Sequence, residues 1–268
     1  MKKNKNHPLM SIIMNCHNGE QFLSESIKSI FSQTYNNWEL IFFDNNSKDK
    51  SSTILKKFKD KRIKYYKSSK TLKLYDARNQ AIKKSKGKYI CFLDTDDLWT
   101  KNKIKYQVKF MEANKEFNMV YSNFYTLDQI KKKTYIQNRF ELPNGYITKK
   151  ILMKYTIGIL TVCIKKSIFS KYLFQKKYNI IGDFDFFVKM SLKNRVGCIQ
   201  KPLAYYRVHK NNYSKRKIKN YIEELNQWIM RNEKIFKSVK INLIHQKIFL
   251  LKLRIKYYFD IFGRVVQW

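Results

Sequence analysis

The chain is predicted to fold as an α/β domain with a mostly parallel sheet flanked by helices, followed by a helical, basic C-terminal extension. Short apolar runs alternate with segments of helical spacing over residues 9–110. Most of these runs end in polar or acidic clusters, as strands do in sheets that bind ligands beyond their carboxyl ends. Alternating strands and helices favour parallel pairing, because right-handed crossovers return each strand to the same direction.

The N-terminal half repeats a unit of strand, loop and helix. After the first strand, Phe22, Ile27 and Ile30 recur at the spacing of a helix with one apolar face. The expected strands are 9–14, 38–43, 63–66 and 89–93, and the expected helices are 22–33, 51–58 and 76–84. This order predicts the parallel part of the sheet.

The pattern changes after residue 97. We expect helices at 101–114 and 184–190, strands at 119–126 and 158–164, and two short paired strands at 196–199 and 203–208. The polar stretch 128–144 has three consecutive lysines and ends in Pro-Asn, so it is expected to form a hairpin or a mobile loop.

From residue 213 onward the chain is expected to be helical and basic. An apolar stripe runs through this segment among Lys and Arg residues; it comprises Leu243, Ile248, Leu251, Ile255, Tyr258 and Phe259. Such a stripe packs against its own domain or, because it is flanked by basic residues, lies on a membrane surface.

The net charge of +36 arises from 56 basic and 20 acidic residues. Only nine of the basic residues are Arg, whereas proteins that read nucleic-acid sequence favour Arg for bidentate contacts to guanine. The lysines fit either the codon bias of an AT-rich genome or attraction to anionic lipid head groups and phosphorylated substrates. We therefore expect no nucleic-acid partner, and an anionic membrane surface is a candidate partner.

The cysteines indicate a reducing compartment. All four lie far apart in the sequence, and no CxxC pair occurs. Residues 1–8 are polar and basic, unlike a signal peptide, and no stretch of about 18 apolar residues is present. The expected location is the cytoplasm, with peripheral association at the inner face of the cell membrane as an option.

The strand expected at 89–93 leads into Asp94, Asp96 and Asp97. Carboxylates this close repel one another, so they persist most readily where a divalent cation or well-placed donors neutralise them. The alternative is an acidic loop in which Asp97 or Thr100 caps the next helix.

Five segments together resemble family 2 glycosyltransferases: SIIMNCHNG (11–19), SQTYNNWEL (32–40), FDNNS (43–47), ARNQA (77–81) and GKYICFLDTDD (87–97). The similarity is close over residues 9–110 and looser to about residue 214. It implies the GT-A fold and transfer of a sugar from a nucleotide-diphosphate donor with inversion at the anomeric carbon. The implied organisation is a GT-A domain at 1–214, with a nucleotide-binding half (9–110) and an acceptor-side half (111–214), and a basic helical tail at 215–268.

The resemblance also assigns donor-binding residues. Asp44 and Asp94 are expected to accept hydrogen bonds from the base and the ribose, with Asn15 and Asn45 beside them. Asn45 stands where many members carry a second Asp. Arg78 would meet the diphosphate as a fixed cation, although a surface salt bridge is the alternative.

The metal site implied by the resemblance contains Asp96 and His209. Asp96 would bind Mg²⁺ or Mn²⁺, with Asp97 either sharing that role or capping the helix. His209 lies in YYRVHKNNYS (205–214), which is similar to the tyrosine-arginine-x-histidine segment of the family. A neutral imidazole would complete the metal shell, and a charged one would hold the diphosphate.

Asp183 is the candidate catalytic base, because an inverting transfer needs a group that takes the proton of the attacking hydroxyl. Its alternative is a plain helix cap, and Asp185 is a second candidate base. Many relatives have an acidic residue immediately before this Asp, where this chain has Gly182. A position at a helix N-terminus is expected to lower the pKa of Asp183.

The sequence thus predicts a metal-dependent inverting glycosyltransferase with a UDP-sugar favoured as donor. The expected acceptor is a glycan or lipid-linked hydroxyl in surface polysaccharide or lipopolysaccharide synthesis. The alternative is a basic nucleic-acid- or membrane-binding protein with an inactive GT-A-like domain. A nucleotidyltransferase would need a Gly-rich loop containing Arg after the first strand, and residues 15–21 contain one Gly and no Arg or Lys.

Overall fold

The computed structural model describes residues 7–212 and 217–265, with side chains to residue 259. Most of the basic N-terminal segment, and Tyr213 and Ser214 of the histidine-containing segment, lie outside the described residues. The N-terminal half comprises β1 (Met10–Cys16), α1 (Glu20–Phe31), β2 (Trp38–Asp44), α2 (Ser51–Lys56), β3 (Ile63–Lys67), α3 (Leu74–Lys84) and β4 (Tyr89–Phe92). Every element expected in this half is confirmed.

The C-terminal half comprises β5 (Leu98–Trp99), α4 (Lys103–Ala113), β6 (Met119–Asp128), β7 (Lys133–Ile136), α5 (Thr148–Met153), the 3₁₀ helices η1 (Ile159–Thr161) and η2 (Lys166–Ser170), β8 (Cys163–Lys165), α6 (Gly182–Ser191), β9 (Val196–Val208), α8 (Ile218–Ser238) and α9 (Ile244–Val265). The hairpin expected at 128–144 is present as β6 and β7, which pair antiparallel.

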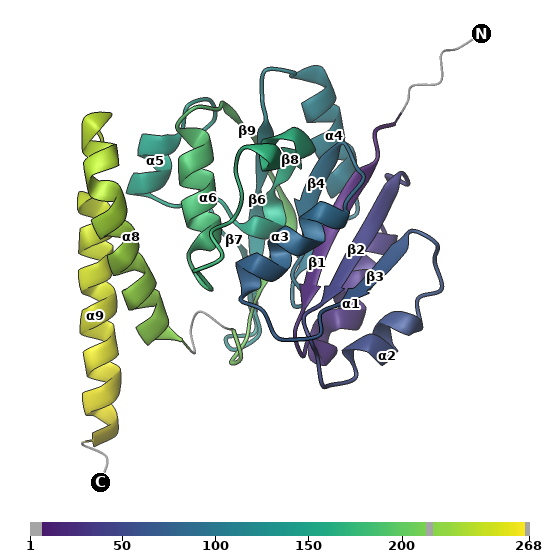
Figure 1. Cartoon of the computed structure of the whole chain (residues 1–268), viewed down its shortest axis with the longest axis horizontal. Helices are drawn as coiled ribbons and strands as arrows, with labels where there is room; N and C mark the ends of the chain where they lie inside the picture. The colour runs from purple at the N-terminus through teal and green to yellow at the C-terminus, as the bar shows by residue number, and fades with distance from the viewer. Residues whose placement is uncertain (1–6, 213–216, 266–268) are drawn as a thin grey trace.

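The strands of the described residues form a nine-stranded sheet in the order β3-β2-β1-β4-β8-β6-β9-β5, with β7 paired to β6 (Figure 1). β3, β2, β1 and β4 are parallel to one another, which confirms the α/β class. Beyond β4 the sheet is mixed: β8 pairs antiparallel with β4 and β6, and β9 pairs parallel with β6. The carboxyl ends of β1, β2 and β4 therefore meet at one edge of the sheet.

Two apolar cores cover the two faces of the sheet. Alternate residues of β1 point to opposite faces, so Ile12 joins one core and Ile13 the other. α1 and α4 pack on the first face, and α3, α6 and α8 contribute to the core on the second. The four cysteines are unpaired, and three are buried, as expected for reduced core residues.

Two predictions of the C-terminal half are wrong. The segment 158–164 is mainly the 3₁₀ helix η1, and its strand begins only at Cys163, because Gly158 and the short apolar run close a tight turn through the Thr161 to Gly158 hydrogen bonds. The segments 196–199 and 203–208 do not pair with each other. They form one strand, β9, which pairs with β6 and is interrupted by register shifts near Pro202, a residue without an N–H for the ladder.

The C-terminal helices pack against the sheet domain. α8 and α9 lie side by side next to α5 and α6 (Figure 1). Trp228 of α8 is buried, and its indole N–H donates to Asp185 Oδ1 of α6 at 2.8 Å. Of the six residues in the predicted apolar stripe only Leu243 is buried, and the other five side chains are exposed.

Candidate active site

A cavity of about 420 Å³ lies beyond the carboxyl end of β4. Its lining includes Arg78 from α3, Asp94 and Asp96 from the loop after β4, and Asp183 from α6. The parallel β1–β4 pair and the antiparallel β8 place these segments around one opening. The structure thus brings together four of the residues expected from the sequence, although they are up to about a hundred positions apart.

Arg78 is paired with Asp94 inside this cavity. Its Nη2 lies 2.7 Å from Asp94 Oδ1, and the Arg78 side chain is only 2% exposed. The guanidinium is surrounded by the rings of Tyr75, Phe92 and Phe174 at 5.3–5.8 Å. The alternative of a surface salt bridge is therefore wrong for Arg78. A cation held this rigidly by one carboxylate keeps donors free for an anionic ligand.

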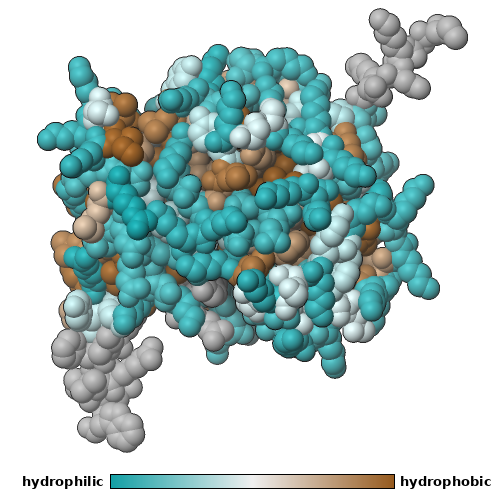
Figure 2. Space-filling view, in the orientation of Figure 1, coloured by the Kyte–Doolittle hydropathy of each residue, from teal (hydrophilic) through white to brown (hydrophobic). Residues whose placement is uncertain are grey.

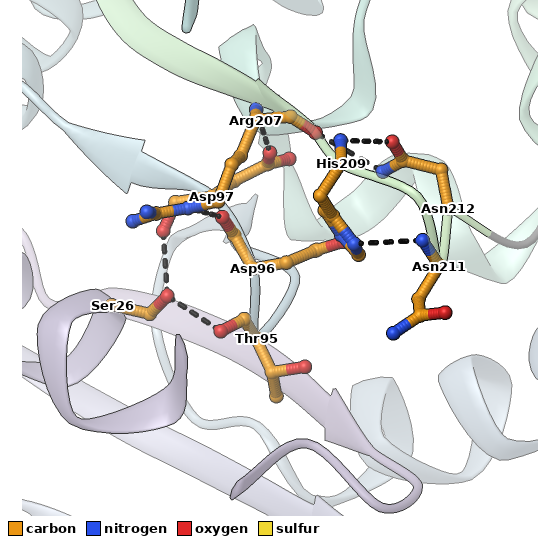
Figure 3. A network of polar contacts seen from close by, with 8 residues as sticks. All are labelled: Ser26, Thr95, Asp96, Asp97, Arg207, His209, Asn211 and Asn212. Carbon is orange, nitrogen blue, oxygen red and sulfur yellow. Dashed lines mark hydrogen bonds and ion pairs between the residues drawn. The ribbon is translucent and has the colours of Figure 1, made fainter. Parts of the chain in front are cut away.

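Asp96 faces His209 across the loop after β4 (Figure 3). His209 Nε2 lies 3.0 Å from Asp96 Oδ2, and the Asn211 backbone N–H donates to the other ring nitrogen. Asn212 accepts from the His209 backbone N–H and so closes the turn that carries the imidazole. The sequence prediction that these two side chains share a site agrees with this geometry.

Asp97 also lines the cavity, but it is held by a structural contact. It is buried, and its Oδ1 accepts the backbone N–H of Arg207 at 2.9 Å (Figure 3). Burial raises its pKa well above the ordinary value, and the charges of Asp96 and Asp94 add to this effect. Asp97 does not cap α4, whose N-cap is Asn102, so both expectations of a capping role for Asp97 or Thr100 are wrong.

Asp183 lies in the first turn of α6, where the N-cap is Ile181. Its Oδ1 accepts from the Tyr75 hydroxyl at 3.1 Å and from the Phe184 N–H at 2.8 Å. Burial raises the pKa of Asp183 above its ordinary value, and the hydrogen bond from Phe184 opposes the shift. The expectation that the helix N-terminus would lower this pKa is therefore wrong, because desolvation outweighs the helix dipole and the donors. Asp183 is also not an N-cap.

Tyr75 explains why Gly182 precedes Asp183. A Cβ at Gly182 would lie 2.4–2.6 Å from atoms of the Tyr75 ring, so no side chain fits at this position without moving that ring. The single hydroxyl proton of Tyr75 is shared between Asp183 and the Ile180 carbonyl, which lies 3.0 Å from the hydroxyl oxygen. The site therefore uses a buried tyrosine beside Asp183, and sequence reasoning missed it. Its only local signal was its place three residues before Arg78.

Asp185 faces α8 and does not line the cavity. Besides the Trp228 indole, its Oδ1 contacts Lys189 Nζ at 2.6 Å, one helical turn away. Its surroundings are those of a structural carboxylate buried between two helices.

Asn15, Asp44 and Asn45 lie together at the ends of β1 and β2, and they do not line the cavity. Asp44 accepts from the Ser47 N–H and from the Tyr65 hydroxyl. The Asn45 amide makes two hydrogen bonds to the backbone of Leu72 and so fixes the loop before α3. The amide atoms of Asn15 are buried and have no partner among the described residues, which is uncommon for a polar group in a folded protein.

The Asp96 carboxylate suits a divalent cation, whereas His209 as placed donates its Nε2–H to Asp96, because its Nδ1 accepts the Asn211 N–H. Among the described residues no group of three or more His, Cys, Asp or Glu side chains is placed to hold a metal. Mg²⁺ in nucleotide sites is commonly held by one or two protein ligands together with substrate phosphates and water. The partly exposed Asp96 carboxylate meets that lower requirement, and His209 would join it once the Asn211 contact is released and the ring proton moves to Nδ1.

Comparisons with known proteins agree with the fold and identify the family. Residues 11–176 match the model of the family described as glycosyl transferase family 2. The Escherichia coli UDP-Glc:alpha-D-GlcNAc-diphosphoundecaprenol beta-1,3-glucosyltransferase WfgD is 31% identical over 82% of this chain and 84% of its own. WfaP, of the same description and organism, is 34% identical over 90% of this chain and 91% of its own.

The fold is also shared with a solved structure, that of S. aureus TarS residues 1–349 in complex with UDP-GlcNAc. The TM-score is 0.69 at 16% sequence identity, covering 94% of this chain and 72% of that one. The chain belongs to the family 2 glycosyltransferases. It is an inverting enzyme that transfers a sugar from a nucleotide-diphosphate donor to an acceptor hydroxyl, and these relatives give no support to the alternative of an inactive binding protein.

Proposed function

We propose that the protein transfers glucose from UDP-glucose to an N-acetylglucosamine carried on a polyprenyl diphosphate, forming a β-linkage during synthesis of a surface polysaccharide or lipopolysaccharide. The two E. coli relatives, whose descriptions name this donor and acceptor, support the substrates. The observation that carries the chemistry is the single cavity that contains Arg78, Asp94, Asp96 and Asp183.

The donor lies between the two groups of polar residues described above. Arg78 binds the diphosphate, because its charge is fixed by Asp94 and a buried guanidinium presents several N–H donors. Asp94 binds the ribose, and Asp44, Asn45 and Asn15 form the side of the site that meets the base. The unpartnered amide of Asn15 supports this assignment, since a ligand contact would satisfy it after a small rearrangement.

Asp183 acts as the general base. Its carboxylate takes the proton of the acceptor hydroxyl while the new bond forms to the anomeric carbon and the bond to the diphosphate breaks. The Tyr75 hydroxyl orients the carboxylate through the contact to Oδ1, which leaves Oδ2 available for the acceptor. Asp185 is excluded from this role by its contacts with Trp228 and Lys189.

Asp96 and His209 are the residues that would hold Mg²⁺ or Mn²⁺. A bound divalent cation would neutralise the charge that develops on the departing diphosphate. The turn formed by Arg207, Asn211 and Asn212 keeps the imidazole opposite Asp96, which lines the cavity.

We further propose that the enzyme acts in the cytoplasm at the inner face of the membrane. None of the described helices combines the length and apolar character that crossing a bilayer requires. α9 instead exposes apolar side chains between basic ones; Figure 2 shows apolar patches on the side of the molecule where Figure 1 places this helix. An anionic lipid surface would attract the lysines and accept the apolar residues.

Donor turnover tests the transferase assignment. Purified protein is incubated with Mn²⁺ or Mg²⁺ and with UDP-, GDP-, CDP- and dTDP-sugars, and nucleotide release is measured. We expect metal-dependent release of UDP from UDP-glucose, lost in Asp96→Ala and kept in Asp60→Ala, whose carboxylate pairs with Arg62 away from the cavity. If wild-type protein neither binds nor hydrolyses any of these donors in the presence of metal, the proposed function is wrong.

A further inference from the structure

A second cavity, of about 480 Å³, adjoins the active-site cavity. The two share three lining residues, Tyr155, Ile180 and Asp183. The remaining walls of the second cavity come from α5, α6, α8 and α9. The carboxylate assigned as the base therefore borders both spaces, and the C-terminal helices enclose only the second.

The two cavities differ in chemistry. The first contains Arg78, Asp94, Asp96 and Asp97, which suit a nucleotide diphosphate and a cation. Apart from Asp183, the second contains one ionisable group other than tyrosine, His245, and otherwise mostly apolar walls. These walls comprise Ile151, Leu152, Ile181, Phe184, Leu225 and Phe249. A diphosphate is poorly matched to this space, and a ligand with an apolar portion fits it.

Gln246 supplies an oriented polar group to the second cavity. It is 7% exposed, and its Nε2 donates to the carbonyl of Leu152 in α5. That contact fixes the plane of the amide. Oε1 is buried and has no hydrogen-bond partner among the described residues. An acceptor oxygen left unpaired in an apolar wall is costly, so it marks a place where a ligand O–H or N–H would be bound after a small rearrangement of the wall.

We propose that the second cavity is the acceptor subsite and that α9 determines acceptor specificity through Gln246 and Phe249. The inference rests on the proposed function, because only a transferase needs an acceptor hydroxyl beside Asp183. In-line attack requires the acceptor hydroxyl to reach the anomeric carbon from the face opposite the leaving diphosphate, with Asp183 beside that hydroxyl to take its proton. Gln246 Oε1 accepts a hydrogen bond from a hydroxyl or amide N–H of the acceptor sugar, and the apolar walls contact the apolar face of that sugar, whose diphosphate and chain extend out of the cavity.

Gln246→Leu tests the hydrogen bond, with Gln227→Leu as its matched control. Gln227 lies on the exposed side of α8 and lines neither cavity. Initial rates are measured at saturating UDP-glucose against an alkyl-diphosphate N-acetylglucosamine, and the Kd of UDP is measured by calorimetry. We expect the KM for this acceptor to rise about tenfold in Gln246→Leu only, with the Kd of UDP unchanged in both variants.

Phe249→Ala tests the apolar wall by a route that does not disturb Gln246. Phe249 is partly exposed, so its truncation should leave the fold intact. The control is Met230→Ala, at an exposed residue of α8. We expect kcat/KM to fall about tenfold both for the long-chain acceptor and for the same sugar diphosphate with a methyl group in place of the chain, because Phe249 contacts the sugar, with the Kd of UDP unchanged.

The outcomes separate the two proposals. Normal UDP binding and transfer, together with wild-type acceptor KM values in both Gln246→Leu and Phe249→Ala, would overturn the acceptor subsite and leave the proposed function standing. A wild-type enzyme that binds no UDP would overturn both. A rise in the Kd of UDP equal to the rise in acceptor KM would also overturn the subsite, because the cavity would then act on the donor.

Discussion

Asp183 illustrates how one residue is tuned by its surroundings. A carboxylate at a helix N-terminus in water would have a lowered pKa, but here the loss of hydration dominates and raises it. A raised pKa makes the carboxylate a stronger base, provided that it stays ionised at the working pH. The ring of Tyr75 leaves room only for glycine at position 182. The Tyr75 hydroxyl also donates to Asp183 Oδ1, which limits the rise in the pKa of Asp183.

The raised pKa of Asp183 predicts the pH dependence of the enzyme. Since the base must be ionised, kcat/KM should fall as pH falls through the raised pKa, at a pH above the ordinary value for Asp of about 3.9. Asp183→Asn should lower kcat by about 10²–10⁴ with UDP affinity unchanged. Rates are measured across pH, with Asp185→Asn as the control, since Asn retains an oxygen for Trp228.

The same shift predicts a change in stability. A carboxyl group with a raised folded-state pKa stabilises the fold below its unfolded pKa, and this contribution is lost as pH rises through the folded pKa. Near neutral pH the ionised Asp183 is therefore a cost, and Asp183→Asn should unfold at the same temperature as wild type or higher. A loss of both stability and UDP binding would show that Asp183 is structural.

Individual site residues differed in how far the sequence could identify them. Arg78, Asp94 and Asp96 lie in short motifs whose spacing carries their role, and the structure places them in one cavity. Tyr75 and Gln246 carry no such signal, because their partners are distant in sequence: Tyr75 contacts Asp183 across 108 positions. Contacts of this kind depend on how α3, α6 and α9 pack, which no local pattern records.

At the scale of elements, α8 holds the loop that leads into α6. The Glu224 carboxylate accepts three consecutive backbone N–H groups, those of Asn179, Ile180 and Ile181, at 2.7–3.1 Å. These residues immediately precede Gly182 and Asp183. Hydrogen bonds from backbone N–H groups to a charged carboxylate are among the stronger kinds, so this one side chain fixes the approach to the base.

Glu224→Gln is expected to loosen that approach. An amide offers one acceptor oxygen, so at least one of the three N–H groups would lose its partner, at a cost of about 1–3 kcal/mol in the free energy of unfolding. We expect a lower kcat with an unchanged Kd for UDP. Denaturant unfolding and steady-state kinetics measure both, with the exposed neighbour in Glu223→Gln as control. Equal stability in the two variants would contradict the role of Glu224.

Helices and strands were predicted correctly where the spacing of apolar residues was regular. Predictions were wrong where the pairing of a strand depended on a strand distant in sequence. β1 to β4 and the helices between them follow from their apolar runs, whereas β9 was expected as two strands that pair with each other. Its partner is β6, and the register shift near Pro202 that divides the pattern lies within a single strand. A break in periodicity therefore marked a bulge here rather than the end of a strand.

At the scale of the whole molecule, one face of α9 lines the second cavity and the opposite face is exposed to solvent. Gln246 and Phe249 border the second cavity, and Leu250 is buried against the protein. The outward face carries Ile255, Tyr258 and other exposed apolar side chains among basic residues. A helix arranged in this way would place the acceptor cavity close to the lipid surface from which a polyprenyl-linked sugar must come.

The outward face of α9 is expected to bind anionic bilayers. The protein should sediment with vesicles of phosphatidylglycerol and phosphatidylcholine, bind phosphatidylcholine vesicles weakly, and be released by salt, because each surface lysine contributes on the order of 1 kcal/mol at a charged surface. Ile255→Glu should lower binding about tenfold, since it replaces an exposed apolar side chain that would enter the lipid with a charge of the same sign as the lipid head groups. Ile130→Glu, at the exposed turn between β6 and β7, is the matched control.

Transfer to the methyl-linked acceptor should be unaffected in both variants, whereas transfer to a long-chain acceptor embedded in anionic vesicles should fall in Ile255→Glu only. Equal binding of the two variants would assign the attraction to net charge alone and remove α9 from the membrane contact.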